Sequence, residues 1–307
     1  MICGIIGKGS IGIRHSKILK NLNIKFYFLR RKANCKVKNE ITFKNRLINK
    51  IDFFIISNPS SLHLKTIKKV IVYDKPILVE KPFVTQNKIP KVIKNYKKIF
   101  VLYQMRFDPR INFIKKNLNN KNLIKANFIW KTFLPNWHKY EDYRKSYAAR
   151  KILGGGAIFT MSHEIDTAIY ILGGIKEVFV KKYKNKLKTD VEENIRIYFK
   201  HISGHNSSII LDFTSKNKIR QFNFKIKNKI YFKWNFFEKK IKFKNKTVAF
   251  NFNNDDIYKK QLKNIILHIK QKKYKSSRIH LSKILHTQKI LNSCIVSMKK
   301  KEIIKII

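Results

Sequence analysis

The sequence is poor in acidic residues, cysteine, glycine and proline. Only 18 Asp and Glu oppose 69 Lys and Arg in 307 residues, so the formal net charge is +51. Such a charge predicts salt-sensitive, nonspecific attraction to polyanions such as RNA, DNA or an anionic membrane face. The lysines are spread over nearly the whole chain, however, whereas a nucleic-acid footprint gathers its cations on one face. With abundant Asn, Ile and Phe, this spread favours drift toward A- and T-rich codons over a specific nucleic-acid partner.

Cysteine is too sparse to build a framework. Cys3, Cys35 and Cys294 lie far apart and form no CxxC pair, which predicts no disulfide scaffold, no metal site and a reducing cytoplasm. The start, MICGIIGKGS, lacks the basic segment of a signal peptide. No apolar run reaches the ~18 residues that span a bilayer. We therefore expect a cytoplasmic protein with no membrane partner.

Short apolar runs alternate with helical stretches in the first third of the chain. Runs at 2–6, 24–29, 51–57, 76–80 and 99–105 predict strands, with helices between them that include 10–22 and 86–97. This alternation predicts a doubly wound parallel sheet whose ligands lie at the carboxyl ends of the strands. A helix at 109–118, an extended run at 123–133 and successive strands between 177 and 252 predict a large, mostly antiparallel sheet. Two amphipathic helices, 256–272 and 281–298, close an α/β chain long enough for two domains.

A glycine-rich turn follows the first strand. Residues 7–12, GKGSIG, fit GxGxxG between a predicted strand and a predicted helix, the context that a dinucleotide site requires. Gly7 permits the tight turn, Gly9 lets the backbone approach a pyrophosphate, and Gly12 allows close helix–strand packing. The N–H groups of Ser10 and Ile11 at the helix start would hold phosphate oxygens. The alternative is a glycine turn that only packs.

The second strand ends in Arg30 and Arg31. NAD sites commonly place Asp or Glu here to bind the ribose hydroxyls, whereas arginine suits the 2′-phosphate of NADP. The sequence therefore predicts NADP or NAD, with NADP preferred.

Four further motifs make a family resemblance specific: NPSSLH at 58–63, EKP at 80–82, YQMRFDP at 103–109 and GGG…SHEID at 154–166. With GKGSIGIRH, their order resembles the Gfo/Idh/MocA oxidoreductases, the family of glucose–fructose oxidoreductase and inositol dehydrogenase. The resemblance covers residues 2 to about 175. It implies a Rossmann domain, set at residues 1–120, and a substrate-binding and oligomerisation domain with a large open sheet, set at 121–307.

The resemblance also implies chemistry. Members oxidise or reduce a hydroxyl or keto group of a sugar or related molecule with a nicotinamide cofactor, and many are dimers or tetramers. The EKP lysine, here Lys81, would lie beside the nicotinamide and share a proton with the reacting oxygen. The alternative is one more surface lysine. Residues matching the family's cofactor contacts are Asn58, Pro59, Ser60, His63, Glu80, Lys81, Gln104 and Arg106.

No lysine or arginine falls between Lys151 and Lys176, although cations are everywhere else. As a helix, this segment would turn an apolar face to the core, with His163, Asp166 and Tyr170 on the opposite face. An ordinary solvated face here would carry lysines, so we expect this face to line a cleft between domains. His163 is the candidate general acid/base, with Asp166 orienting it or binding a substrate hydroxyl. The alternative is a buried His–Asp pair that satisfies only itself.

Two features complete the predicted site. Many relatives have Asp where this chain has Thr160, which puts the proton relay in doubt. The aromatic segment 137–147 is expected to cover the substrate through Trp137, His138, Tyr143 and Arg144, or else to pack on itself. The sequence thus predicts an NAD(P)-dependent oxidoreductase acting on a sugar or nucleotide sugar, within a branch associated with surface glycans. The alternative is a cofactor-binding protein without turnover.

Overall fold

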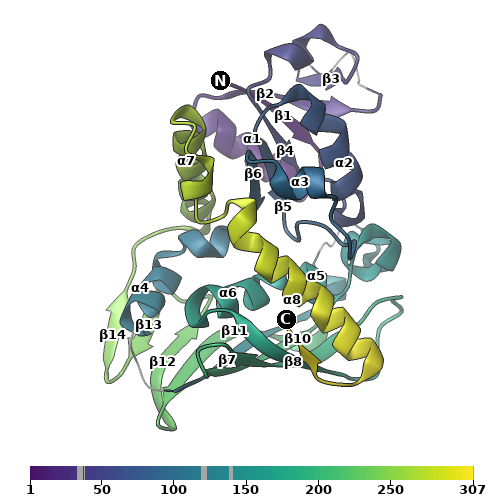
Figure 1. Cartoon of the computed structure of the whole chain (residues 1–307). Helices are drawn as coiled ribbons and strands as arrows, with labels where there is room; N and C mark the ends of the chain where they lie inside the picture. The colour runs from purple at the N-terminus through teal and green to yellow at the C-terminus, as the bar shows by residue number, and fades with distance from the viewer. Residues whose placement is uncertain (33–36, 38, 119–122, 138–140, 307) are drawn as a thin grey trace. The chain divides into compact units, whose positions relative to one another are not determined.

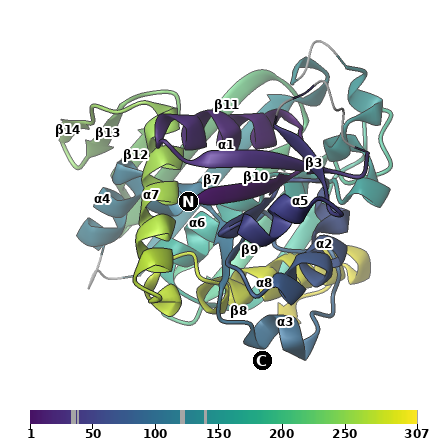
Figure 2. The ribbon, with the colours of Figure 1, turned by 90° about the horizontal axis from the view of Figure 1, so that it is seen from above.

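The computed structural model describes residues 1–32, 37, 39–118, 123–137 and 141–306. The chain forms two compact units, Met1–Gln104 with Asn254–Leu285, and Met105–Asn253 with His286–Ile307. The domain boundary expected after residue 120 stays a prediction. The segment Asn254–Leu285 belongs to the first unit because α7 (Asn254–Lys270) packs beside α1 (Ser10–Asn21) (Figure 2).

The first unit contains a six-stranded sheet in the order β3-β2-β1-β4-β5-β6, with every neighbouring pair parallel (Figure 1). The strands are β1 (Ile2–Ile6), β2 (Lys25–Arg30), β3 (Glu40–Thr42), β4 (Phe53–Ile56), β5 (Ile77–Glu80) and β6 (Ile99–Leu102). This is the order of the Rossmann fold. Every residue of β4, β5 and β6 is buried, as expected when helices cover both faces of a parallel sheet.

The helices between these strands include α2 (His63–Val70) and α3 (Lys91–Asn95). The helix predicted at 86–97 forms only as α3. Pro90 explains the late start, because the residue before a proline is driven out of the helical region. Strand β3 was not predicted, and it pairs Glu40 with Phe28 of β2.

The second unit contains a nine-stranded sheet in the order β14-β13-β12-β11-β7-β10-β9-β8-β15. The strands are β7 (Ile124–Phe133), β8 (Ile175–Lys182), β9 (Asn194–His201), β10 (Asn206–Asp212), β11 (Thr214–Ile226), β12 (Lys229–Asn235), β13 (Lys240–Phe243), β14 (Lys246–Ala249) and β15 (Ile304–Lys305). Strands β7 and β10 pair in parallel and the other neighbours pair antiparallel, which confirms the predicted mostly antiparallel sheet.

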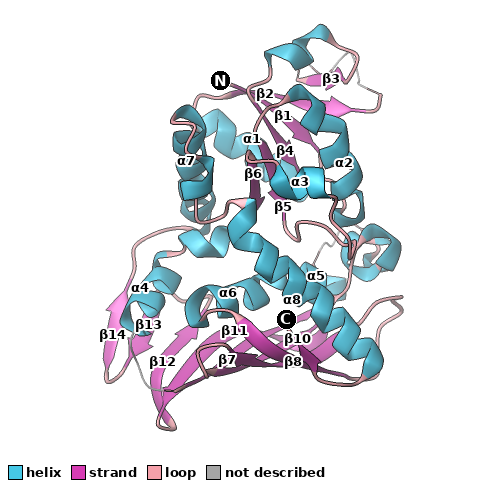
Figure 3. Ribbon diagram, in the orientation of Figure 1, coloured by secondary structure: helices cyan, strands magenta, loops and turns pink. Residues whose placement is uncertain are grey.

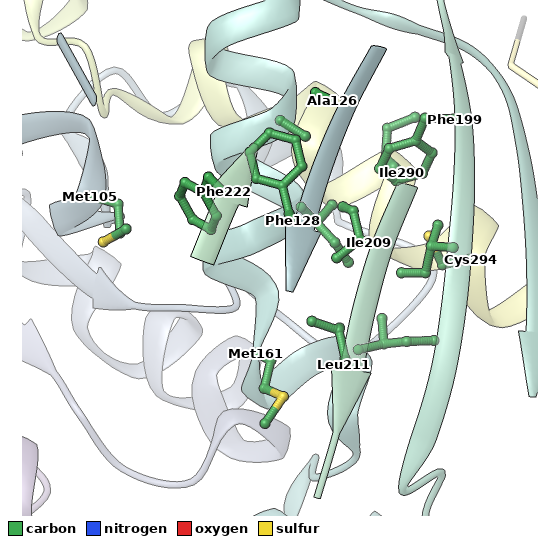
Figure 4. Packing of buried hydrophobic residues seen from close by; sticks show 14 of the residues in the cluster. Met105, Ala126, Phe128, Met161, Phe199, Ile209, Leu211, Phe222, Ile290 and Cys294 are labelled. Carbon is green, nitrogen blue, oxygen red and sulfur yellow. The ribbon is translucent and has the colours of Figure 1, made fainter. Parts of the chain in front are cut away.

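Helices cover one face of this sheet (Figure 3). They are α4 (Pro109–Leu118), α5 (Ala157–Thr160), α6 (Ser162–Leu172) and the second-unit part of α8 (Leu281–Lys300). Alternate strand residues point into the core, where the ring centroids of Phe128 and Phe222 lie 4.8 Å apart. Helix α8 contributes Ile290 and Cys294 to this core (Figure 4). The alternation turns the remaining strand residues, such as Lys125, Asn127 and Lys200, to the other face. Among the described residues, no helix is long and apolar enough to cross a membrane.

Candidate nucleotide and catalytic site

The glycine turn has three glycines with different physical roles. Gly7 has φ +111°, and a Cβ there would lie 2.5 Å from Asn58 N. A Cβ on Gly12 would lie 2.1 Å from Gly7 O, so α1 starts directly against the turn. At Gly9, in contrast, a Cβ would meet nothing within 4 Å. Packing therefore requires Gly7 and Gly12, whereas Gly9 faces open space.

That open space lies at the amino end of α1. The first N–H groups of a helix have no intrahelical partner, and those of Ser10 and Ile11 begin this one. A pyrophosphate approaching over Gly9 would find these donors and the positive end of the helix dipole. The residues present therefore fit a dinucleotide.

The loop after β4 is tied to the turn after β5 by a buried histidine. His63 is 1% exposed, with Nε2 3.0 Å from Asn58 O and Nδ1 2.9 Å from Pro82 O. Burial lowers the pKa of His63. Its ring thus holds two loops of the first unit together, and the predicted contact with a cofactor stays a prediction. Pro59 and Ser60 open the short 3-10 helix that leads into α2.

The Lys81 turn follows β5, at the carboxyl edge where the sequence places it. Glu80 is 7% exposed, and its Oε1 lies 2.7 Å from His15 Nε2. Its Oε2 accepts a hydrogen bond from the Lys81 N–H at 3.2 Å. The structure therefore brings Glu80 and Lys81 to the same edge as the glycine turn. His15, which ends the quoted motif GKGSIGIRH, was not among the predicted site residues, although it contacts Glu80.

Gln104 and α7 meet in the first unit. Gln104 donates from Nε2 to the Tyr258 hydroxyl at 3.0 Å, and the Arg14 guanidinium lies 5.0 Å from the Tyr258 ring. Tyr258 comes from the segment that the sequence assigned to the second domain. Nothing near it in the sequence signals its return to the first unit.

The segment free of Lys and Arg forms two helices instead of one, because Met161 leaves the helical region with φ −99° and ψ 26°. His163 is 4% exposed and Asp166 is fully buried. Asp166 accepts hydrogen bonds from Arg106 Nε at 2.9 Å and Arg106 Nη2 at 2.7 Å, and from Thr287 Oγ1 at 2.8 Å. Arg106, predicted as a cofactor contact, thus forms a buried ion pair inside the second unit.

Glu164, the other acidic residue of α6, also forms a buried ion pair with an arginine. Arg220 Nε donates to Glu164 Oε1 at 2.7 Å, and the Arg220 guanidinium lies 4.0 Å from the Trp130 ring and 4.1 Å from the Phe236 ring. The predicted unsolvated character of this helix is therefore correct. Lysines are absent because the helix is buried and arginines from distant positions pair with its acids.

The glycines before α5 pack against their own chain. A Cβ on Gly155 would lie 2.3 Å from Tyr147 O. Gly156 has φ +99°, and a Cβ there would lie 2.4 Å from Glu192 Oε1. Glu192 accepts a hydrogen bond from the Ile158 N–H at 2.9 Å, and burial raises its pKa to about 7. These contacts explain the glycines without a ligand.

The predicted substrate residues differ in burial, from the buried Thr160 to the exposed Arg144. Trp137 donates a hydrogen bond from Nε1 to Thr132 Oγ1 at 2.9 Å. Its ring stacks on that of Trp130, with 6.1 Å between the ring centroids. Arg144 is exposed and pairs with Asp142 at 2.8 Å, and its hydrogen bond lowers the pKa of Asp142. Tyr143 is half-buried and Thr160 is 2% exposed. His138 lies outside the described residues.

Two groups of predicted residues therefore form, one in each unit. The first unit gathers the glycine turn, Asn58, His63, Glu80 and Lys81 at the carboxyl edge of its sheet. The second unit holds Thr160, His163, Asp166 and Arg106 on and around α5 and α6.

The fold of this chain, with a parallel Rossmann sheet and a large second sheet, is similar to that of several solved sugar dehydrogenases. No family model and no curated protein matches the chain. Levoglucosan dehydrogenase in complex with NADH has a TM-score of 0.82 at 15% identity, over 100% of this chain and 99% of that one. Myo-inositol dehydrogenase from Corynebacterium glutamicum has a TM-score of 0.77 at 16% identity, with the same coverage. The WlbA dehydrogenase from Bordetella pertussis, in complex with NADH and UDP-GlcNAcA, has a TM-score of 0.74 at 13% identity, again over 100% and 99%. The predicted resemblance is confirmed at the level of the fold.

Proposed function

We propose that this protein is an NAD(P)-dependent oxidoreductase that transfers a hydride between C4 of the nicotinamide and a hydroxyl or keto carbon of a sugar or nucleotide sugar. The glycine turn carries this proposal. Gly7 and Gly12 close the turn by packing, and Gly9 leaves room above the helix amino end where a pyrophosphate would bind. Levoglucosan dehydrogenase and the WlbA dehydrogenase hold NADH in their structures, and the latter also holds a nucleotide sugar.

Lys81 and His163 are the proposed proton carriers. The Lys81 turn is held by Glu80 at the carboxyl edge of the first sheet. His163 is buried beside the Asp166–Arg106 pair on α6. A positioned acid/base group contributes roughly 100-fold or more to the rate. Asp166, fully engaged by Arg106 and Thr287, would orient the site and not itself exchange the proton.

Lys81→Ala and His163→Ala test the assignment. Each is expected to slow turnover of a sugar or nucleotide-sugar panel by at least ~100-fold while nucleotide binding persists. Lys68→Ala, on an exposed position of α2, is the matched control and should turn over normally. Near-normal rates in both site variants would refute the assignment.

A second candidate, a dinucleotide-binding protein without turnover, is favoured by one observation. Thr160 is buried, 2% exposed, at the position where the resemblance to the Gfo/Idh/MocA family implies an acid. Tight NADH or NADPH binding with no turnover across the panel would select this candidate.

The remaining parts of the proposal concern partners and setting. Association of copies through the open face of the second-unit sheet would bury exposed groups such as Tyr198, which stacks on Phe179 at 6.2 Å. Light scattering would report the resulting dimer or tetramer. A cytoplasmic setting and a role in surface-glycan synthesis are also proposed, the former because Cys3 and Cys294 are free thiols. A preference for NADP rests on Arg30 and Arg31 alone.

A further inference from the structure

An acidic side chain lies between two cations beside the glycine turn. Glu40 Oε1 is 2.7 Å from Lys8 Nζ and 4.0 Å from Arg30 Nε. The Glu40 side chain is only 6% exposed, whereas those of Lys8 and Arg30 are 35% and 41% exposed. The carboxylate is therefore held in place, and the two cations are partly open to solvent.

This arrangement comes from three separate segments of the first unit. Lys8 is the second residue of the glycine turn, and its ammonium lies 5.7 Å from the Phe28 ring. Glu40 opens β3 and pairs in register with Phe28, two residues before Arg30 ends β2. The parallel pairing thus carries an acid from the next strand to the edge where β2 and the glycine turn meet. At the end of β2 itself the sequence has Arg30 and Arg31 and no acidic residue.

The position matters for nucleotide choice. When a pyrophosphate binds at the amino end of α1, the adenosine ribose lies near the end of β2. A carboxylate there accepts hydrogen bonds from the ribose hydroxyls of NAD. A 2′-phosphate brings further negative charge, which the carboxylate repels, and it would need the cations that Glu40 already engages.

We propose that Glu40 sets the nucleotide preference of this protein and makes it NAD rather than NADP. The inference rests on the proposed dinucleotide site, and it reverses the preference that Arg30 and Arg31 predict. In this arrangement Lys8 and Arg30 hold the Glu40 carboxylate in place and are themselves engaged by it. Removing the carboxylate charge would release both cations toward a 2′-phosphate.

Glu40→Gln, compared with wild type by equilibrium titration with NADH and NADPH, tests the inference. Wild type is expected to bind NADH more tightly. Glu40→Gln is expected to move the ratio of the two dissociation constants toward NADPH by at least ~10-fold. Asp74→Asn is the matched control. It removes one negative charge from an exposed ion pair with Lys98 in the same unit, near the amino end of β5, and should keep the wild-type ratio.

Salt separates this effect from bulk charge. NADPH is the more anionic nucleotide, and nonspecific attraction to a chain of net charge +51 weakens as salt rises. If the effect is specific, the ratio of the two dissociation constants should differ between Glu40→Gln and Asp74→Asn at high salt as it does at low salt. A wild type that prefers NADPH, or an unchanged ratio in Glu40→Gln, overturns the inference and leaves the proposed function standing. Failure of wild type to bind either nucleotide overturns both.

Discussion

Glu192→Gln probes a buried carboxyl of the second unit whose pKa is raised well above the usual value. Glu192 is 8% exposed, packs against Gly156 and accepts a hydrogen bond from the Ile158 N–H. Burial raises its pKa from 4.5 to about 7. Glutamine keeps the shape and the acceptor oxygen but cannot ionise. The substitution therefore isolates the cost of charging this site.

The sign follows from proton binding. Between pH 4.5 and about 7 the unfolded chain releases the Glu192 proton while the folded protein keeps it. Wild type therefore loses stability as pH rises through this window, and the loss is complete above pH 7. The difference between a pKa of 4.5 and one of about 7 corresponds to about 3 kcal/mol, since one pH unit is worth about 1.4 kcal/mol. Relative to wild type, Glu192→Gln should gain about 3 kcal/mol of unfolding free energy between about pH 4.5 and about pH 8.5.

Urea unfolding followed by tryptophan fluorescence measures this difference. Trp130, Trp137 and Trp234 all lie within Met105–Asn253, so the signal reports the unit that contains Glu192. Glu141→Gln, at an exposed position, is the charge-matched control and should follow the wild-type profile. Parallel pH profiles for Glu192→Gln and wild type would show that burial does not hold the proton on Glu192.

Two other predictions concern backbone strain and acid sensitivity. Gly156→Ala forces a side chain into φ +99° and against the Glu192 carboxylate, so the unfolding free energy should fall by about 2 kcal/mol or more. Gly9→Ala meets no atom within 4 Å and should change stability by less than about 0.5 kcal/mol while weakening nucleotide binding; equal losses in both variants would contradict the assigned roles. Burial lowers the pKa of His201 from 6.5 to about 4. Between these pH values the unfolded chain binds a proton at His201 and the folded protein does not, so the unfolding free energy falls by about 3 kcal/mol as pH drops through that range. His201→Gln should flatten this acid limb in the same urea titrations, and an unaltered limb would count against it.

Local patterns in the sequence were sufficient for most of the helices and strands and for the glycine turn. The strands at 2–6, the helix at 109–118 and the extended run ending at 133 occur as predicted, because periodicity and turn residues act over a few neighbours. The glycine spacing likewise predicts the turn, since φ at Gly7 and the contact at Gly12 depend on nearby backbone. The order of motifs then pointed to the fold that the similar structures share.

Pairings between distant charged groups could not be predicted, because 69 cations offer too many partners for 18 acids. In the folded chain Arg106 pairs with Asp166 and Arg220 pairs with Glu164. The cofactor contact expected of Arg106 stays a prediction. Folding also brought Glu40 to Lys8 through a strand that was too short to recognise. Periodicity describes which face of an element is buried, whereas the choice of partner depends on how strands and helices pack in three dimensions.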